Sequence, residues 1–431
     1  MADPKVAVVG LGKIGLPVAV RCALSGLQVV GCDINEQRVA ALNAGRNPIE
    51  DEIGLDDALA EVVAEGRFKA TTETAIAVKE ADVVIVLVRL EHVGTGLDYS
   101  IMDAANASIA EGLHPGALIV YETTLPVGDT RRFAQELAGR SGLALGTDLF
   151  VAFSPERVYS GRILQDLEAY PKVVGGVDAA SGARARVFYE RALPGVRVVE
   201  LESSEAAELV KLAETTYRDI NIAFANELAR EADRLGIDVD PVIELANSQP
   251  FSHIHRPGAG VGGHCIPHYP RFLLEGGAQA PLVKLARDLN EEQPLYVVER
   301  LRQELGTLRG KRVLVMGVAY RENVRETTSS PGLVIARALR EAGADVSLND
   351  PYYSDDELQA FGGAPARLED IGSFDAVIVQ AMHDRYRAAD WTSRLGAGEV
   401  VIDGRNALDP DSVVATGATY IGIGRRRRGP A

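Results

Sequence analysis

Residues 5–15 read Lys-Val-Ala-Val-Val-Gly-Leu-Gly-Lys-Ile-Gly. The apolar run 5–9 predicts a short buried strand, and the glycine turn after it leads into an apolar-periodic helix that we expect to end near Ser25. A second apolar run, 27–32, predicts another strand and ends in Asp33. Strand, glycine turn, helix, strand and acid in this order are typical of the first βαβ unit of a dinucleotide-binding sheet.

The three glycines of this stretch have separate tasks. Gly10 makes the tight turn, Gly12 lets a pyrophosphate approach the backbone, and Gly15 lets helix and strand pack closely. The first N–H groups of the helix then face the phosphates. Asp33 is placed to hold the ribose hydroxyls and would repel a 2′-phosphate, which favours NAD over NADP. The predicted cofactor-binding residues are Gly10, Gly12, Lys13, Ile14, Gly15, Asp33, Arg38 and Thr124.

Strand and helix patterns alternate along most of the chain. Further strands are predicted at 83–88, 117–121 and 149–153, in a first domain that ends near residue 200. A helical pattern without proline follows at 203–235, and another at 281–305.

A second series of strands begins at Arg312. Its later members lie near 345–349, 376–379 and 400–402, and it contains Gly317 but no complete G-x-G-x-x-G motif. We therefore expect an α/β fold: two Rossmann-like doubly wound domains joined by a long central helix and a small helical domain. The predicted domains are 1–200, the NAD-binding Rossmann domain; 201–305, a central helical dimerisation domain; and 306–431, a Rossmann-like domain for a different nucleotide.

Composition narrows the class of protein. The chain has 431 residues, a net charge of -16 and three cysteines, and no apolar run approaches the ~20 residues that span a bilayer. We expect a soluble cytoplasmic protein without a secretory signal, a disulfide framework or a membrane partner. The negative charge disfavours nucleic acid as a partner, and we expect the basic run 425–428 to be a frayed, solvated end.

The segment 258–267, Gly-Ala-Gly-Val-Gly-Gly-His-Cys-Ile-Pro, places Cys265 after four glycines. Glycine allows tight bends and close approach of another group, so this thiol is predicted to be a nucleophile and not a packing residue. Cys22 and Cys32, by contrast, are predicted to be small core residues. A thiol that holds an acyl group and a cofactor that accepts hydride together predict an oxidation.

Three polar residues are candidate partners of this thiol. Glu156 and Thr124 each follow a predicted strand, at the carboxyl end where open α/β sheets bind ligands, and Lys211 lies on the long helix. Each has a structural alternative: Thr124 as a helix cap, Glu156 in a pair with Arg157 or another base, and Lys211 as a side chain that merely projects from its helix. Four histidines also surround the cysteine, but so glycine-rich a segment is too loose to pre-organise ligands, and we predict no metal site. Instead, His264 is expected to line the pocket or to favour the thiolate.

Several segments together resemble the nucleotide-sugar 6-dehydrogenases, the UDP-glucose and GDP-mannose dehydrogenase family. The motifs Ser-Pro-Glu-Arg and Gly-Gly-His-Cys-Ile are more similar to those of the UDP-N-acetylhexosamine branch than to those of UDP-glucose enzymes. The matching segments are 9–17, 154–158, 171–176, 216–227, 260–267 and 401–406.

This resemblance implies a four-electron oxidation of a sugar C6 alcohol to the acid, with a thiohemiacetal and then a thioester on Cys265. It also implies that Lys211 stabilises oxyanions, that Glu156 handles water or protons, and that Thr124 holds water. The C-terminal domain would bind the UDP part of the substrate, and the long helix would form a homodimer. The catalytic set is Cys265, Lys211, Glu156, Thr124 and Thr215. The substrate-binding set is Glu156, Arg157, Lys211, Arg256, Gly262, Tyr320 and Arg321.

The chain departs from the family pattern at four places. Tyr269 stands where the family has Asp, Thr215 where it has Asn, Arg89-Leu90 where it has Thr-Pro, and Thr328 where it has Arg. We expect the oxidation to survive and the later hydrolysis to be rearranged. A UDP-glucose substrate, a single oxidation, and a nucleotide-sugar sensor without activity are the alternatives.

Overall fold

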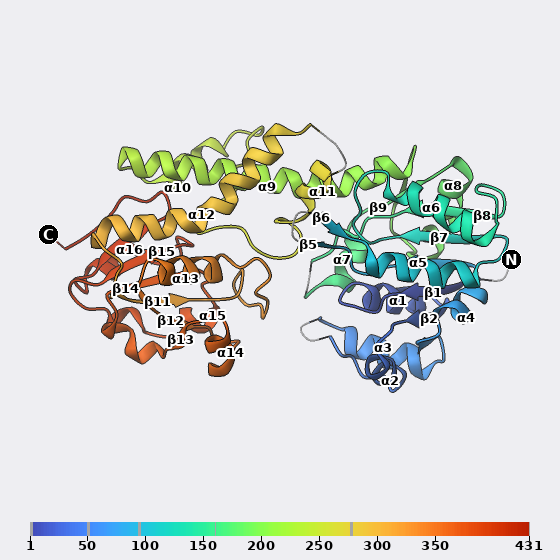
Figure 1. Ribbon diagram of the computed structural model, residues 1–431, viewed down its shortest axis with the longest axis horizontal. Coiled ribbons are helices and arrows are strands. Elements are labelled where there is room, and N and C mark those ends of the chain that lie inside the picture. The colour runs from blue at the N-terminus through green and yellow to red at the C-terminus, as the bar shows by residue number, and fades with distance from the viewer. Residues whose placement is uncertain (1–2, 50–51, 94–95, 160, 276–278, 431) are drawn as a thin grey trace. The chain divides into compact units, whose positions relative to one another are not determined.

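The computed structural model describes residues 3–49, 52–93, 96–159, 161–275 and 279–430. Contacts divide the chain into two compact units, which are described separately (Figure 1). Unit 1 comprises Met1–Glu214 and Glu275–Ala278, and unit 2 comprises Thr215–Leu274 and Gln279–Ala431. The division into three domains at residues 200 and 305 stays a prediction.

Unit 1 contains an eight-stranded sheet in the order β10-β9-β8-β7-β4-β1-β2-β3. Six of its strands, β1 to β4, β7 and β8, are parallel, whereas β9 and β10 are parallel to each other and run antiparallel to those six. The chain moves outward in opposite directions from β1 and β4, so the crevice of this doubly wound sheet lies at the carboxyl ends of those two strands. The strands are β1 (Lys5–Val9), β2 (Gln28–Cys32), β3 (Phe68–Thr71), β4 (Val83–Val86), β7 (Ala117–Tyr121), β8 (Leu149–Phe153), β9 (Lys172–Gly176) and β10 (Val198–Leu201).

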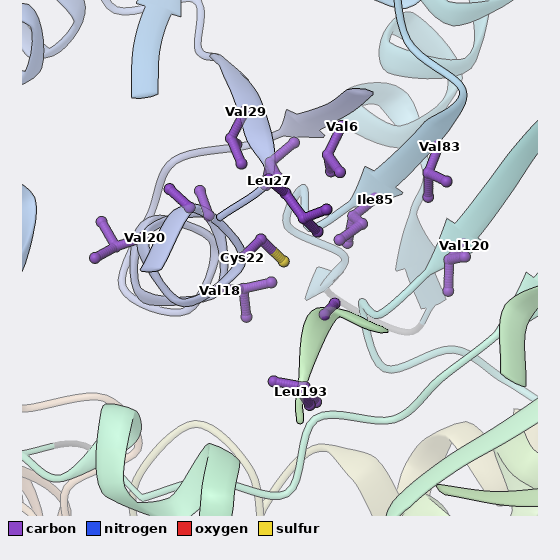
Figure 2. Close-up of a cluster of buried hydrophobic side chains, with 14 of the residues drawn as sticks. Val6, Val18, Val20, Cys22, Leu27, Val29, Val83, Ile85, Val120 and Leu193 are labelled. Atoms are coloured by element: carbon purple, nitrogen blue, oxygen red, sulfur yellow. The ribbon is translucent and has the colours of Figure 1, made fainter. Parts of the chain in front are cut away.

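Helices complete unit 1 and cover its apolar core. The sulfur of Cys22 points into this core beside Val18, Leu27 and Ile85 (Figure 2), and Cys32 is also buried, as predicted. The helices are α1 (Gly15–Leu24), α2 (Glu36–Asn43), α3 (Leu55–Ala64), α4 (Thr74–Lys79), α5 (Ser100–Gly112), α6 (Asp129–Ser141), α7 (Ile163–Ala169) and α8 (Ala179–Ala192), and β5 (Glu91–Val93) and β6 (Gly96–Asp98) form a hairpin.

The predicted long helix is α9, Ser204–Leu235, drawn in green in Figure 1. Its first turns belong to unit 1, where the buried carboxylate of Glu208 accepts hydrogen bonds from the backbone N–H groups of Gly128 (2.6 Å) and Thr130 (2.8 Å). These N–H groups lie at the start of α6 and have no partner within that helix, so Glu208 caps it from outside. An ion pair between Arg131 and Glu205 (2.6 Å) adds a second connection between α6 and α9.

Replacing this cap is expected to change how stability depends on pH. Burial raises the pKa of Glu208 from 4.5 to about 7, against hydrogen bonds that lower it. The folded state therefore holds more protons than the unfolded chain between these values, so this group makes the free energy of unfolding fall as pH rises through that window. Glu208→Gln should lower stability by about 1 kcal/mol through loss of a cap acceptor and should flatten this pH dependence. Denaturant unfolding at both ends of the window measures the slope, and an unchanged slope would contradict the prediction.

Unit 2 contains a six-stranded parallel sheet in the order β13-β12-β11-β14-β15-β16, which has the Rossmann-like arrangement predicted for the C-terminal part. Its strands are β11 (Arg312–Met316), β12 (Asp345–Asn349), β13 (Ala364–Pro365), β14 (Ala376–Val379), β15 (Val400–Asp403) and β16 (Thr419–Gly422). Its helices are α10 (Val239–Ala246), α11 (Tyr269–Glu275, whose last residue belongs to unit 1), α12 (Pro281–Leu305), α13 (Pro331–Glu341), α14 (Asp355–Ala360), α15 (Asp384–Arg387) and α16 (Pro410–Val414), with 3-10 turns η1 (Leu368–Ser373) and η2 (Thr392–Arg394).

The basic run at the end of the chain is not frayed, contrary to the prediction. Arg425 pairs with Asp240 (2.6 Å), Arg427 with Glu304 (2.6 Å), and the backbone of Arg428 bridges to Tyr420. The run is held in place because acidic side chains of unit 2 form ion pairs with it, and composition alone does not reveal these partners.

Among the residues that the structure describes, none of the helices has the length and apolar character that crossing a bilayer requires.

Candidate active site

The glycine turn after β1 has the geometry that a bound dinucleotide requires. Gly10 has a φ of +96°, and a Cβ there would lie 2.7 Å from the carbonyl oxygen of Leu87. A Cβ on Gly15 would lie 1.8 Å from the carbonyl oxygen of Gly10, so helix and turn meet there without room for a side chain. A Cβ on Gly12 would meet nothing within 4 Å, which leaves this part of the turn open to a ligand. The residues present therefore fit NAD.

Asp33 lies at the carboxyl end of β2, where the ribose of such a ligand would be held. Its Oδ2 accepts from the N–H of Leu11 (3.1 Å) and from Nη1 of Arg38 (2.9 Å), and its Oδ1 accepts from the N–H of Asn35 (2.9 Å). The carboxylate thus joins the glycine turn to β2, and the predicted cofactor residue Arg38 is its ion-pair partner. Lys13 is exposed on the turn, and Ile14 is the residue before α1.

Glu156 follows β8 at the same edge of the sheet and is buried. Its partner is Lys172, the first residue of β9, and not the neighbouring Arg157. Arg157 pairs instead with Glu214 of α9. Lys172 also contacts Glu122, which follows β7, at 2.8 Å. Two carboxyl groups from adjacent strands therefore share one buried ammonium group.

Lys211 of α9 reaches the same place. Its Nζ donates to the backbone carbonyl oxygen of Glu156 at 2.5 Å, so two of the predicted catalytic residues are in direct contact within unit 1. Thr124 is half-buried in the loop between β7 and α6. The residue that caps α6 is Gly128, so the alternative in which Thr124 caps a helix is wrong.

In unit 2, the segment that carries Cys265 is fixed by backbone hydrogen bonds. Gly258 receives one bond from the Gln293 side chain of α12 and donates one to the Asn226 side chain of α9, both at 3.0 Å. The N–H of Ala259 donates to the carbonyl oxygen of Gly404 (2.8 Å), and the N–H of Gly263 donates to that of Thr328 (2.8 Å). The segment is therefore held in place, although its glycines led us to expect a loose loop.

The glycines of this segment pack directly against Tyr320, in the loop that follows β11. A Cβ on Gly262 would lie 2.7 Å from Cβ of Tyr320, and one on Gly263, whose φ is +91°, would lie 2.8 Å from its ring. Arg321 donates from Nε to the hydroxyl oxygen of Tyr320 (3.1 Å). Three predicted substrate-binding residues, Gly262, Tyr320 and Arg321, are thus brought together in unit 2.

A side chain at position 263 should displace the cysteine segment. Gly263→Ala places a methyl group against an aromatic ring and requires a left-handed backbone conformation, which costs of order 1–3 kcal/mol. We expect kcat to fall by about 10²-fold, because shifts of about 1 Å at a reacting group have effects of this size. NAD affinity, measured by fluorescence titration, should stay unchanged. Gly139→Ala, where a Cβ meets nothing within 4 Å, is the control, and a Gly263→Ala enzyme with normal kcat would contradict the argument.

Cys265 itself is exposed, and its carbonyl oxygen accepts from the N–H of Tyr269 (2.9 Å) at the start of α11. His264 and His268 lie edge to face at 5.9 Å between ring centroids, and His268 contacts Ser329 (3.1 Å). Thr215 is buried on α9, one turn after Lys211. Within the described ranges, no three His, Cys, Asp or Glu side chains come close enough to hold a metal ion together.

The predicted site residues therefore fall into two sets. Unit 1 holds the cofactor residues with Thr124, Glu156, Arg157 and Lys211, and unit 2 holds Thr215, Arg256, Gly262, Cys265, Tyr320 and Arg321. Arg256 is exposed before the cysteine segment. Sequence reasoning missed Lys172, Glu122, Asn226 and Gln293. The available signals were a lysine directly before the apolar residues 173–174, and the amide side chains of Asn226 and Gln293 within helical patterns.

Comparisons with known proteins identify three family regions. Residues 4–193 match the NAD-binding domain of the UDP-glucose/GDP-mannose dehydrogenase family, residues 205–292 its central domain, and residues 314–410 its UDP-binding domain. A UDP-N-acetyl-D-mannosamine dehydrogenase from Pyrococcus horikoshii is 36% identical over 98% of this chain and 99% of that protein.

Solved structures agree with the sequence matches. The structure of a UDP-D-ManNAc dehydrogenase from Pyrococcus horikoshii has a TM-score of 0.89 at 34% identity and covers 98% of this chain and 99% of that one. An NDP-N-acetyl-D-galactosaminuronic acid dehydrogenase from Methanosarcina mazei has a TM-score of 0.88 at 30% identity, with 99% and 96% covered. The chain therefore belongs to the UDP-glucose/GDP-mannose dehydrogenase family and is an NAD-dependent nucleotide-sugar dehydrogenase.

Proposed function

We propose that this chain oxidises the C6 alcohol of a UDP-N-acetylhexosamine, with UDP-N-acetyl-D-mannosamine as the first candidate, to the corresponding uronic acid. The observation that carries this proposal is the match, over nearly the full length of both proteins, to a relative with that activity in its name. The exposed thiol of Cys265, on a segment bonded to the nucleotide-binding half of unit 2, supports it.

The proposed chemistry assigns separate tasks to the chain's own residues. NAD bound at the glycine turn would accept one hydride, and a second NAD that replaces the NADH formed would accept the other. Removal of a hydride and a proton turns the C6 alcohol into an aldehyde, and the thiolate of Cys265 adds to its carbon. A C–S bond forms, the carbonyl electron pair moves to oxygen, and the ammonium group of Lys211 stabilises the oxyanion. Loss of the second hydride from this carbon restores the carbonyl and leaves a thioester.

Release of the acid needs water. Its oxygen forms a bond to the thioester carbon, the C–S bond breaks, and the electron pair leaves with the sulfur of Cys265. Glu156 accepts the proton of this water, and Thr124 holds the water in place. Tyr269 and Thr215 stand where the family resemblance implies an Asp and an Asn, so in this proposal the buried carboxyl groups of unit 1 carry the proton handling.

The domain assignment belongs to the same proposal. Residues 1–200 bind NAD, residues 201–305 carry the cysteine segment and the dimerisation surface, and residues 306–431 bind the UDP part of the substrate. The family regions at 4–193, 205–292 and 314–410 support this division.

The test is to count products. Purified protein is incubated with NAD and each of several UDP-sugars, and NADH absorbance is compared with the mass of the sugar product. Two NADH per uronic acid with a UDP-N-acetylhexosamine is the expected result. One NADH per aldehyde would show a single oxidation, preference for UDP-glucose would change the substrate, and no NADH with any UDP-sugar would favour a sensor.

We also propose that the protein is a homodimer that pairs through the unit 2 part of α9. Tyr217, Phe224 and Leu235 project from this helix exposed, and Leu245 and Phe251 are exposed at the end of α10 and in the following turn. Large apolar side chains gathered on one region mark interaction surfaces. Phe224→Glu should convert the dimer to a monomer in light scattering, whereas Lys284→Glu on α12 should not. A protein that is monomeric without substitution would refute the proposal.

A further inference from the structure

A buried charge cluster in unit 1 contains the carboxyl group of Glu156, whose backbone contacts Lys211. It consists of Glu122, Glu156, Lys172 and Tyr189, which come from the ends of β7 and β8, the start of β9 and α8. All four are nearly enclosed: Glu122 is 2% exposed, Glu156 8%, Lys172 7% and Tyr189 2%.

The hydrogen bonds of the cluster form a chain. Lys172 donates to Oε1 of Glu156 and to Oε1 of Glu122, and the Tyr189 hydroxyl group donates to the same oxygen of Glu122. The ammonium group also lies 4.7 Å from the centre of the Tyr189 ring. Oε2 of Glu122 is buried without a hydrogen-bond partner among the described residues. One ammonium group therefore forms hydrogen bonds with two carboxyl groups, and the hydrogen-bonding capacity of Glu122 is only partly used.

The other basic groups near the cluster bond to atoms outside it or to its backbone. Arg21 of α1 pairs with Glu168 (3.0 Å), and Arg157 pairs with Glu214. Burial raises the pKa of Cys22 to about 12 and that of Tyr189 well above 10, so both stay neutral. Lys211 approaches from α9 and bonds the backbone of Glu156.

The space between these groups is small and largely apolar. Val18, Leu167 and Leu193 join Arg21, Cys22 and the cluster in lining a cavity of about 10 Å³, close to the smallest that holds one water molecule. Charges in such surroundings interact far more strongly than in water. Lys172 is therefore the group that contacts the Glu156 carboxylate directly, and Glu122 shares this ammonium group.

We propose that Lys172 is a positioning residue that keeps the carboxyl group of Glu156 ionised and oriented, and that Glu122 competes with Glu156 for the same ammonium group. This inference rests on the proposed function, in which Glu156 accepts the proton of the water that breaks the thioester. A base in an apolar site becomes protonated unless a cation compensates its charge, and Lys172 supplies that cation. Neither residue touches the reacting atoms; both act through Glu156.

The two partners of Glu156 should shift the pH profile in opposite directions. Lys172→Met removes the cation, so Glu156 binds its proton more tightly and the ascending limb of kcat moves to higher pH by about 1 unit or more. Glu122→Gln removes the competing carboxylate, so the limb moves to lower pH. Lys172→Arg keeps the charge and should restore the limb. Lys79→Met, at the exposed end of α4, is the control and should leave the profile unchanged.

The measurement is kcat for acid formation over about pH 5 to 9, together with NADH formed in the first turnover. Below its shifted limb, the Lys172→Met enzyme should still release two NADH per site and accumulate a thioester detectable by mass on Cys265. The inference would be overturned if the limb stayed in place in both variants or moved in the same direction in both. It would also be overturned if the rate of the first hydride transfer fell as much as the rate of acid formation. Glu122→Gln decides the question if Lys172→Met does not fold. Absence of NADH from the unsubstituted enzyme would instead refute the proposed function.

Discussion

Cys265→Ser should reduce steady-state acid formation by about 10³-fold or more, because a serine hydroxyl group is almost un-ionised near neutral pH and adds poorly to an aldehyde. The substitution should leave the fold intact. Cys265 is exposed, and its segment is held through the backbone of Gly258, Ala259 and Gly263, none of which depends on the thiol. Unfolding temperature and NAD affinity should therefore match those of the unsubstituted protein.

The measurement for this variant is product mass with NADH counted over a single turnover. Loss of the second NADH with retention of the first hydride step would place the thiol at the thioester stage. Full conversion to the acid by Cys265→Ser would show that the covalent route is wrong. The other two cysteines are buried, so a thiol reagent should label Cys265 and leave Cys22 and Cys32 unmodified.

Lys211→Met should lower kcat by about 10² to 10³-fold, the usual cost of removing one donor to an oxyanion. Methionine has nearly the length of lysine, so the contact between α9 and the loop after β8 should remain packed. What is lost is the ammonium group, whose Nζ lies 2.5 Å from the carbonyl oxygen of Glu156. Glu208, which joins the first turns of α9 to the start of α6, is untouched.

The effect of Lys211→Met should fall on kcat more than on KM, because the oxyanion develops only along the reaction. Lys284→Met is a matched control, since Lys284 is an exposed helical lysine paired with Asp288 at 2.5 Å. Retention of kcat within about 3-fold in Lys211→Met would remove this residue from the proposed mechanism.

The fold was largely predictable from the sequence where local patterns are complete. The turn at Gly10 to Gly15 and the helix 281–305 follow from glycine spacing and apolar periodicity, and the latter persists despite Pro294 inside it. The strands β3, β9 and β10 were among those missed. They contain four or five residues each and mix apolar positions with lysine, glycine or glutamate, so tertiary pairing decides them and local pattern does not.

The candidate site was predictable for residues in recognisable segments and not for their partners. Glu156 and Lys211 were identified, but a pair between Glu156 and Arg157 was the structural alternative that adjacency in sequence suggested. The actual partner, Lys172, is 16 residues away. The contact of Tyr320 with the glycines at 262 and 263 is also non-local. It could not be predicted, because a glycine in a sequence does not indicate which residue occupies the space beside it.

The antiparallel pairing of β8 with β9 has a consequence for how the chain tolerates insertion and deletion. Ala152 lies opposite Gly176 and Phe153 opposite Gly175, and the same count, continued past the ladder, sets Lys172 opposite Glu156. Extra residues in the connection between 157 and 171 would therefore leave this pair facing each other, whereas deleting one residue inside β9 would turn the lysine to the other face of the sheet. Within this family, length variation should accumulate in the connection and be absent from the strand.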